Sequence, residues 1–225
     1  KYDLHVFGAK AELPRPMDDD FYLRLGGEFN ARKYEFASDG GRFREDNSRT
    51  LYKTVLRGGA GWFLGEDVLL TGVAEGGGYS DYEDSPDEDD LQLHGEGFLI
   101  FRVNPGAQIV FGVKESNDLE DYSVFPLFGV RLLSEDGRFH LSVTAPLEAR
   151  VGYSISPEFQ LYAGGWISGD EYRIALREGS SEVFQQDRLI GLGMNYWLGS
   201  HVNLRVEGGA SVESKLEYKA DFARE

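Results

Sequence analysis

The stretch from Leu147 to Ser168, LEARVGYSISPEFQLYAGGWIS, alternates apolar and polar residues in two runs separated by Ser-Pro-Glu. The first run places Leu, Ala, Val and Tyr at 147, 149, 151 and 153, with Glu, Arg, Gly and Ser between them. A period of two indicates a β-strand, since successive side chains leave opposite faces. One apolar face and one charged face are typical of a transmembrane β-barrel wall, with lipid outside and water or ion pairs inside.

The same alternation recurs along the chain and predicts an all-β fold. We expect one antiparallel, up-and-down transmembrane β-barrel of about twelve strands, formed by residues 1–225 as a single domain. The strands are expected near residues 2–12, 21–32, 52–62, 68–82, 91–103, 108–114, 124–133, 139–155, 159–168, 190–196 and 202–212. In the first of them, Tyr2, Leu4 and Val6 form the apolar face, and Pro14-Arg15-Pro16 is expected to end it.

The segment from Phe139 to Ile155 has two interpretations. Its apolar residues keep one phase throughout, which suits a single long strand. Pro146 lies in the middle and cannot donate a ladder hydrogen bond, which favours two strands that turn at Ala145-Pro146. Two strands would each be shorter than the ~9–11 residues that a tilted spanning strand needs.

Connections of two lengths alternate along the chain. Short turns, such as Asn104-Pro105-Gly106, are expected on the periplasmic side, and longer acidic loops outside. The longer loops are expected at 38–48, 83–90 and 117–123, and residues 169–187 are expected to hold strand extensions and a further long loop. The acidic run EDSPDEDD at 83–90 could in principle bind a divalent cation, but it lacks the calcium-loop spacing, so a solvated loop is the expectation.

Aromatic residues gather beside the short turns, as in the girdle at one face of a membrane barrel. They are Trp62, Phe63, Phe139, Tyr153, Phe159, Tyr196 and Trp197. The alternative is that they form the core of a soluble β-sandwich.

Composition excludes several classes of protein. The net charge of −16 argues against non-specific nucleic-acid binding, and the lack of cysteine excludes disulfides and thiolate chemistry. No run of ~18 apolar residues predicts a transmembrane helix, and no signal segment opens the sequence. Counting strands from the short turns puts Lys1 on the long-loop side, which leaves open whether a first or a last strand lies outside this sequence.

The segment from Pro126 to Ile174 resembles a family of uncharacterised bacterial outer-membrane β-barrel proteins. The resemblance lies in PLFGVRL, TAPLEARVGY, SPEFQLYAGG and the following GDEYR. It implies an outer-membrane location in a Gram-negative bacterium and a barrel fold. It supplies no catalytic residues, so it implies no activity.

Charged residues that alternate with the apolar ones are expected to face a lumen, where they would pair and close a narrow pore or tune the ions passing through a wider one. They are Arg24, Glu28, Arg32, Lys53, Arg57, Glu75, Glu96, Arg102, Lys114, Arg131, Glu148, Arg150, Arg205 and Glu207. Basic residues outnumber acidic ones in this set, whereas the predicted external loops are acidic.

No catalytic, cofactor-binding or metal site is expected. The best enzymatic candidate is the pair His140 and Ser142 on one strand face, which could act as a His-activated Ser in a lipid-modifying hydrolase, but no carboxylate is placed to orient the His. The four histidines lack metal-ligand spacing, and His94 is expected to hydrogen-bond Glu96.

These observations favour a porin-like channel or a structural and interaction barrel. Its expected partners are outer-membrane lipid and lipopolysaccharide, small solutes or ions, and a protein partner or second copy, with no nucleic acid. A lipid-modifying hydrolase and a soluble β-sandwich or lipocalin-like binder are the alternatives.

Overall fold

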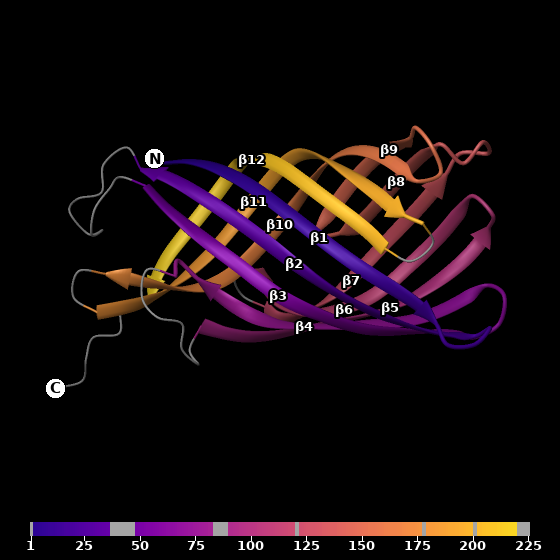
Figure 1. The fold of residues 1–225 in the computed structure, drawn as a ribbon, viewed down its shortest axis with the longest axis horizontal. Coiled ribbons are helices and arrows are strands. Elements are labelled where there is room, and N and C mark those ends of the chain that lie inside the picture. Colours follow the sequence, from indigo (N-terminus) through magenta and orange to yellow (C-terminus); the bar gives the residue numbers. More distant parts are fainter. Residues whose placement is uncertain are drawn as a thin grey trace.

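Twelve antiparallel strands close into a barrel in the computed structural model, which describes residues 2–36, 48–82, 90–119, 122–176, 179–199 and 202–219 (Figure 1). The strands are β1 (Tyr2–Pro16), β2 (Phe21–Phe36), β3 (Ser48–Phe63), β4 (Val68–Ser80), β5 (Leu91–Asn104), β6 (Ala107–Leu119), β7 (Tyr122–Leu133), β8 (Phe139–Ala145), β9 (Glu148–Ser154), β10 (Phe159–Leu176), β11 (Gly179–Leu198) and β12 (Val202–Lys219). Neighbours in sequence pair, and β1 closes the barrel on β12. The predicted all-β, twelve-strand antiparallel fold is confirmed; whether a further strand lies outside this sequence stays a prediction.

In the described part of the chain, no helix is long and apolar enough to cross a membrane.

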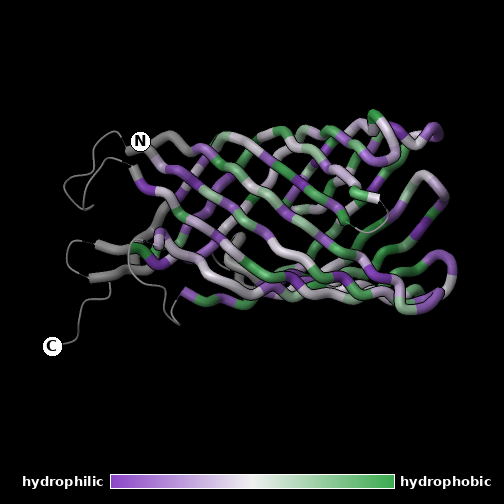
Figure 2. The backbone as a smooth tube through the Cα atoms, in the orientation of Figure 1, coloured by the Kyte–Doolittle hydropathy of each residue, from purple (hydrophilic) through white to green (hydrophobic). Residues whose placement is uncertain are grey.

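Large apolar side chains cover the outside of the barrel and charged ones lie within. Leu56, Leu93 and Leu192 are 77%, 74% and 69% exposed, whereas Lys53 and His94 are buried. Hydrophobic and hydrophilic residues accordingly alternate along the strands in Figure 2. This arrangement inverts that of a soluble protein, in which apolar side chains face inward.

The phase predicted for β1 is wrong. Val6 faces the interior and is buried, whereas Phe7 is exposed on the outside. Val6 belongs to an interior apolar cluster at one end of the barrel, so the period of two was read correctly but its two faces were exchanged. Lys10 lies on the same face of β1 as Val6 and therefore also lines the interior.

Prolines lie where a strand has only one partner. β1 continues to Pro16, contrary to the predicted break, because its pairing with β12 ends at Glu12 while its pairing with β2 extends to Pro16. Pro126 in β7 pairs with β6, and the pairing of β7 with β8 begins only at Phe128. A missing N–H costs nothing on a side without a neighbouring strand.

The segment from Phe139 to Ser154 forms two strands of seven residues each, β8 and β9, which decides between the two interpretations. They turn at Ala145-Pro146, a cis peptide bond, and Leu141 pairs with Val151. β9 pairs with β10 only as far as Trp166, and beyond that residue the strand that β10 pairs with on this side is β4, at Arg173.

The ends of β10, β11 and β12 leave the cylinder as a separate lobe, which we call the closing sheet: residues 168–176, 179–187 and 211–219. The β1–β12 pairing stops at Ala210, and the β11–β12 register shifts between Arg188 and Leu189, a bulge of the kind that bends strands. The closing sheet reaches the opposite wall, where Arg173 pairs with Ser80 at the end of β4 (Figure 1).

The closing sheet packs against the inner faces of β1 to β4. The buried cluster between them comprises Val6, Tyr34, Leu51, Val55, Tyr79, Tyr172, Ile174, Val183 and Leu189. This end of the barrel, which also carries the ends of β1 and β12, is therefore filled by protein.

Two predicted loops are shorter in the structure. Nearly all of 169–187 is strand, with β10 ending at Leu176 and β11 beginning at Gly179, and β6 and β7 likewise extend into 117–123. The loop predicted at 38–48 and the acidic run at 83–90, with its cation alternative, lie outside the described residues except at Ser48 and Asp90.

The aromatic residues beside the short turns lie mainly on the outer face. Trp62, Phe139, Tyr153 and Tyr196 are exposed, and Phe159 lies beside Tyr196 with ring centroids 6.3 Å apart. Trp197 is also exposed at the end of β11. Phe63 differs, because its ring lies 6.1 Å from that of the interior residue Tyr22.

Interior aromatic rings lie over glycines of the adjacent strand. Tyr162 pairs with Gly193, and a Cβ built on Gly193 would lie 2.3 Å from the Tyr162 ring. We expect Gly193→Val to destabilise the barrel by about 1–3 kcal/mol through overpacking. The control, Gly58→Val, adds its side chain where nothing lies within 4 Å and should change stability by less than about 0.5 kcal/mol. Urea unfolding of both variants checks this, and equal stabilities would contradict it.

Candidate functional site

The barrel encloses a cavity of about 790 Å³. At one end its lining includes Pro105 and Gly106 of the short β5–β6 turn, and at the other end Arg32 and Asp170 beside the closing sheet. The cavity therefore runs from the short-turn mouth to the closed end.

Thirteen of the fourteen predicted lumen charges line this cavity. They are Arg24, Glu28, Arg32, Lys53, Arg57, Glu75, Glu96, Lys114, Arg131, Glu148, Arg150, Arg205 and Glu207. Arg102 does not line it, because it lies exposed near the end of β5. The structure adds Lys10, which the wrong phase of β1 concealed, and Asp170, which lay in a segment expected to hold a loop.

One group of ion pairs crosses β2, β3, β4 and β5 in the middle of the cavity. Arg57 contacts Glu28 at 3.0 Å, Glu96 at 3.5 Å, and also Glu75. Lys53 contacts the same Glu75 at 2.8 Å. Within each strand these residues lie an even number of positions apart, on the face that points inward. The alternation of apolar and polar residues was therefore enough to identify them.

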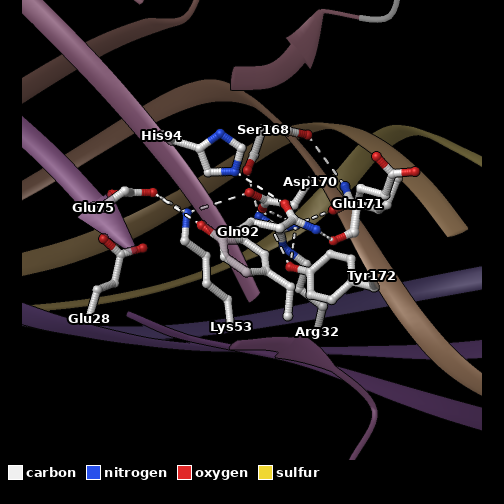
Figure 3. Close-up of polar contacts among 12 residues, drawn as sticks. Glu28, Arg32, Lys53, Glu75, Gln92, His94, Ser168, Asp170, Glu171 and Tyr172 are labelled. Carbon is white, nitrogen blue, oxygen red and sulfur yellow. Dashed lines mark hydrogen bonds and ion pairs between the residues drawn. The ribbon is translucent and has the colours of Figure 1, made fainter. Parts of the chain in front are cut away.

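A second group joins the wall to the closing sheet (Figure 3). Arg32 of β2 is 2% exposed and donates to Asp170 Oδ2 at 2.9 Å and Tyr172 Oη at 3.0 Å, and also to Gln185. Lys53 Nζ lies 3.4 Å from Asp170 Oδ1.

A tyrosine adds a further contact between the wall and the closing sheet. Tyr34 Oη donates to Asp187 Oδ2 at 3.1 Å, and both side chains are almost wholly buried. Ion pairs and hydrogen bonds removed from water depend strongly on their partners, so these contacts fix the closing sheet against β2 and β3.

A third group lies on β9, β10 and β12. Arg150 contacts Glu148 at 3.3 Å and Glu207 at 3.2 Å, and Tyr162 Oη donates to Glu207 Oε1 at 2.6 Å. Arg205 lies 3.9 Å from the same Glu207. Glu207 therefore contacts three side chains, Arg150, Tyr162 and Arg205, whereas Glu148 contacts Arg150.

Positive charge exceeds negative charge in the cavity. Nine Lys and Arg side chains line it against six Asp and Glu. An enclosed space with this imbalance attracts anions.

The histidines do not make the predicted contacts. His140 Nε2 lies 2.8 Å from Ser154 Oγ, and no His140–Ser142 hydrogen bond occurs among the described residues. His94 Nε2 lies 3.2 Å from Gln92 Oε1, while Glu96 is paired with Arg57. Within the described ranges, no group of three or more His, Asp or Glu side chains could hold a metal ion.

A rigid turn at the mouth joins β7 to β8. Asp136 Oδ1 accepts from Ser134 Oγ at 2.5 Å and from the Arg138 N–H at 3.1 Å. These donors hold the pKa of the Asp136 carboxyl below its usual value.

Comparison with known families gave one match. A family model described as a domain of unknown function (DUF6268) matches residues 65–223, which include all of β4 to β12. No curated protein matches the sequence.

Proposed function

The chain belongs to the DUF6268 family of domains of unknown function, and we propose a function from the geometry of its closed twelve-strand barrel. We propose that the protein is an integral outer-membrane β-barrel of a Gram-negative bacterium. In this proposal it is a narrow, non-enzymatic channel that rests closed, and its closing sheet is the gate.

The exposed apolar belt supports the membrane location. Residues such as Leu56, Phe111 and Leu192 would be costly to expose to water together, and a contiguous apolar band on a closed barrel is suited to lipid. A soluble lipocalin-like binder would instead carry its apolar residues inward. The charged interior therefore favours the membrane barrel over that alternative.

The contacts of Arg32, Lys53 and Tyr34 with the closing sheet support a closed resting state. They join strands of the wall to a lobe that lies across one end of the cavity. Release of the closing sheet would connect the cavity to the long-connection side. Small solutes or ions, rather than nucleic acid, suit a lumen of this size and charge.

Planar-bilayer recording of the purified protein tests the channel. We expect low and infrequent conductance in the resting protein, increasing when the buried contacts are weakened. A wide, permanently open conductance would contradict the closed state. A protein that stays monodisperse in buffer without detergent would overturn the membrane proposal itself.

Single cysteines can establish the orientation, because the native chain contains none. We place the short turns in the periplasm, following the usual pattern of such barrels. Glu66→Cys, in the β3–β4 turn, should then react with a membrane-impermeant maleimide only after the outer membrane is permeabilised. Tyr82→Cys, an exposed position at the opposite end, should react in intact cells. The reverse pattern would invert the barrel without removing it from the membrane.

A further inference from the structure

Arg24 of β2 and Arg131 of β7 differ from the other arginines of the cavity. Both line it, and neither has a carboxylate within salt-bridge distance among the residues described. Arg32, Arg57, Arg150 and Arg205 each have at least one such partner.

The two guanidinium groups have little else to bind. Arg24 Nη2 donates to Thr71 Oγ1 at 3.2 Å, while its Nε is buried with no partner. The side chain of Arg131 forms no hydrogen bond within the described chain and is accessible from the cavity. Thr71 is also contacted by Tyr22 Oη at 3.3 Å, so it is shared between two donors.

Both arginines lie toward the mouth of the cavity. Arg24 is three residues from the start of β2, and Arg131 is two residues from the end of β7, so both are near short turns. The guanidinium of Arg131 lies within electrostatic range of Glu148, of Arg24 and of Glu96, in decreasing order of effect. Those two carboxylates are already engaged, Glu96 with Arg57 at 3.5 Å and Glu148 with Arg150 at 3.3 Å.

We infer that Arg24 and Arg131 form a binding site for a small oxyanion, a solute that carries a doubly charged group such as phosphate. Two like charges that face one enclosed space repel each other, and an anion between them removes that repulsion. A guanidinium presents paired N–H donors that match the oxygens of such a group. The cavity, at about 790 Å³, also has room for the remainder of a small solute.

Titration of the full-length protein in detergent with inorganic phosphate, followed by calorimetry, tests this site. We expect saturable binding at one site, weakened at least tenfold by Arg24→Gln and by Arg131→Gln. The double variant should bind little more weakly than either single one, because both residues contact the same anion. Acetate should compete more weakly than phosphate.

The controls separate a site from general charge effects and from misfolding. Arg102→Gln and Arg188→Gln remove exposed arginines outside the cavity lining and should leave phosphate binding unchanged. Without phosphate, Arg131→Gln should not lower the melting temperature, since Arg131 has no ion-pair partner among the described residues. Phosphate should raise the melting temperature of the native protein and of the two control variants more than that of Arg131→Gln. Unsaturable binding, equal competition by chloride, or binding that survives the double substitution would overturn the inference. The site does not require the channel proposal, so a barrel that never conducts could still bind phosphate.

Discussion

We expect Asp170→Ala to open the barrel and to have the largest effect of any single substitution in the cavity. The carboxylate of Asp170 accepts from Arg32 and lies 3.4 Å from Lys53 Nζ, so its loss leaves the buried Arg32 without a carboxylate partner. Removing one partner of a buried ion pair costs about 3–5 kcal/mol. Because this pair joins β2 and β3 to the closing sheet, the cost favours release of the sheet. We expect frequent channel openings in planar bilayers and a lower free energy of unfolding in urea.

Two further variants make this test specific. Arg188→Gln breaks the exposed Arg188–Glu213 pair, which joins β11 to β12 where the closing sheet begins and should contribute at most about 1 kcal/mol. It should leave conductance unchanged. The double substitution Arg32→Met with Asp170→Leu replaces the buried pair by apolar side chains and should restore part of the stability. Conductance of Asp170→Ala equal to that of the native protein would show that the closing sheet is not a gate.

Leu56→Arg should prevent stable insertion into lipid. Leu56 lies on the outer face, six residues from Trp62. A tilted strand advances roughly 2.5 Å per residue along the membrane normal. Leu56 therefore lies about 15 Å along the normal from the level of Trp62, near the middle of the bilayer. Arg at that depth costs about 2–4 kcal/mol. Folding into vesicles of defined composition, followed by urea unfolding, measures the loss.

The matched substitution is Leu64→Arg, in the short turn after β3. Leu64 is also exposed, but it lies outside the strand, in water or among lipid headgroups, so the change should cost little. In a soluble barrel both leucines would face water, and both substitutions would be neutral or would improve solubility. Equal behaviour of the two variants would therefore count directly against a lipid-facing belt.

Much of the wall could be predicted from sequence because the period of two is a local signal. In β2, β3 and β5 the apolar and charged residues separate cleanly, and the predicted interior residues Arg57 and Glu96 contact each other across the strands. In β1 the signal is symmetrical, since Val6 and Phe7 are both apolar. Alternation identifies the two faces of a strand but not which of them points outward. In β1 the packing of Val6 in the interior apolar cluster decides this.

The closing sheet could not be predicted by the same reasoning. Residues 169–187 are polar because Asp170 and Asp187 meet Arg32 and Tyr34 in a buried layer, yet locally such a segment has the composition of a solvated loop. The signal that could have indicated a strand is the alternation of Tyr172 and Ile174 with polar residues. Its packing partners lie far away in the chain, 93 positions for Ser80 and Arg173 and 138 for Arg32 and Asp170, beyond the reach of any pattern read along the chain.

That separation has a consequence for the order of assembly. Arg32 and Asp170 are 138 positions apart, and Tyr34 and Asp187 are 153 apart. Contacts between such distant segments form only after the intervening chain has been ordered, since bringing them together costs entropy before any contact can compensate. The residues that close the barrel are synthesised after those of β2 to β4 that they contact. We therefore expect these contacts to form late in folding, after the strands of the wall have paired.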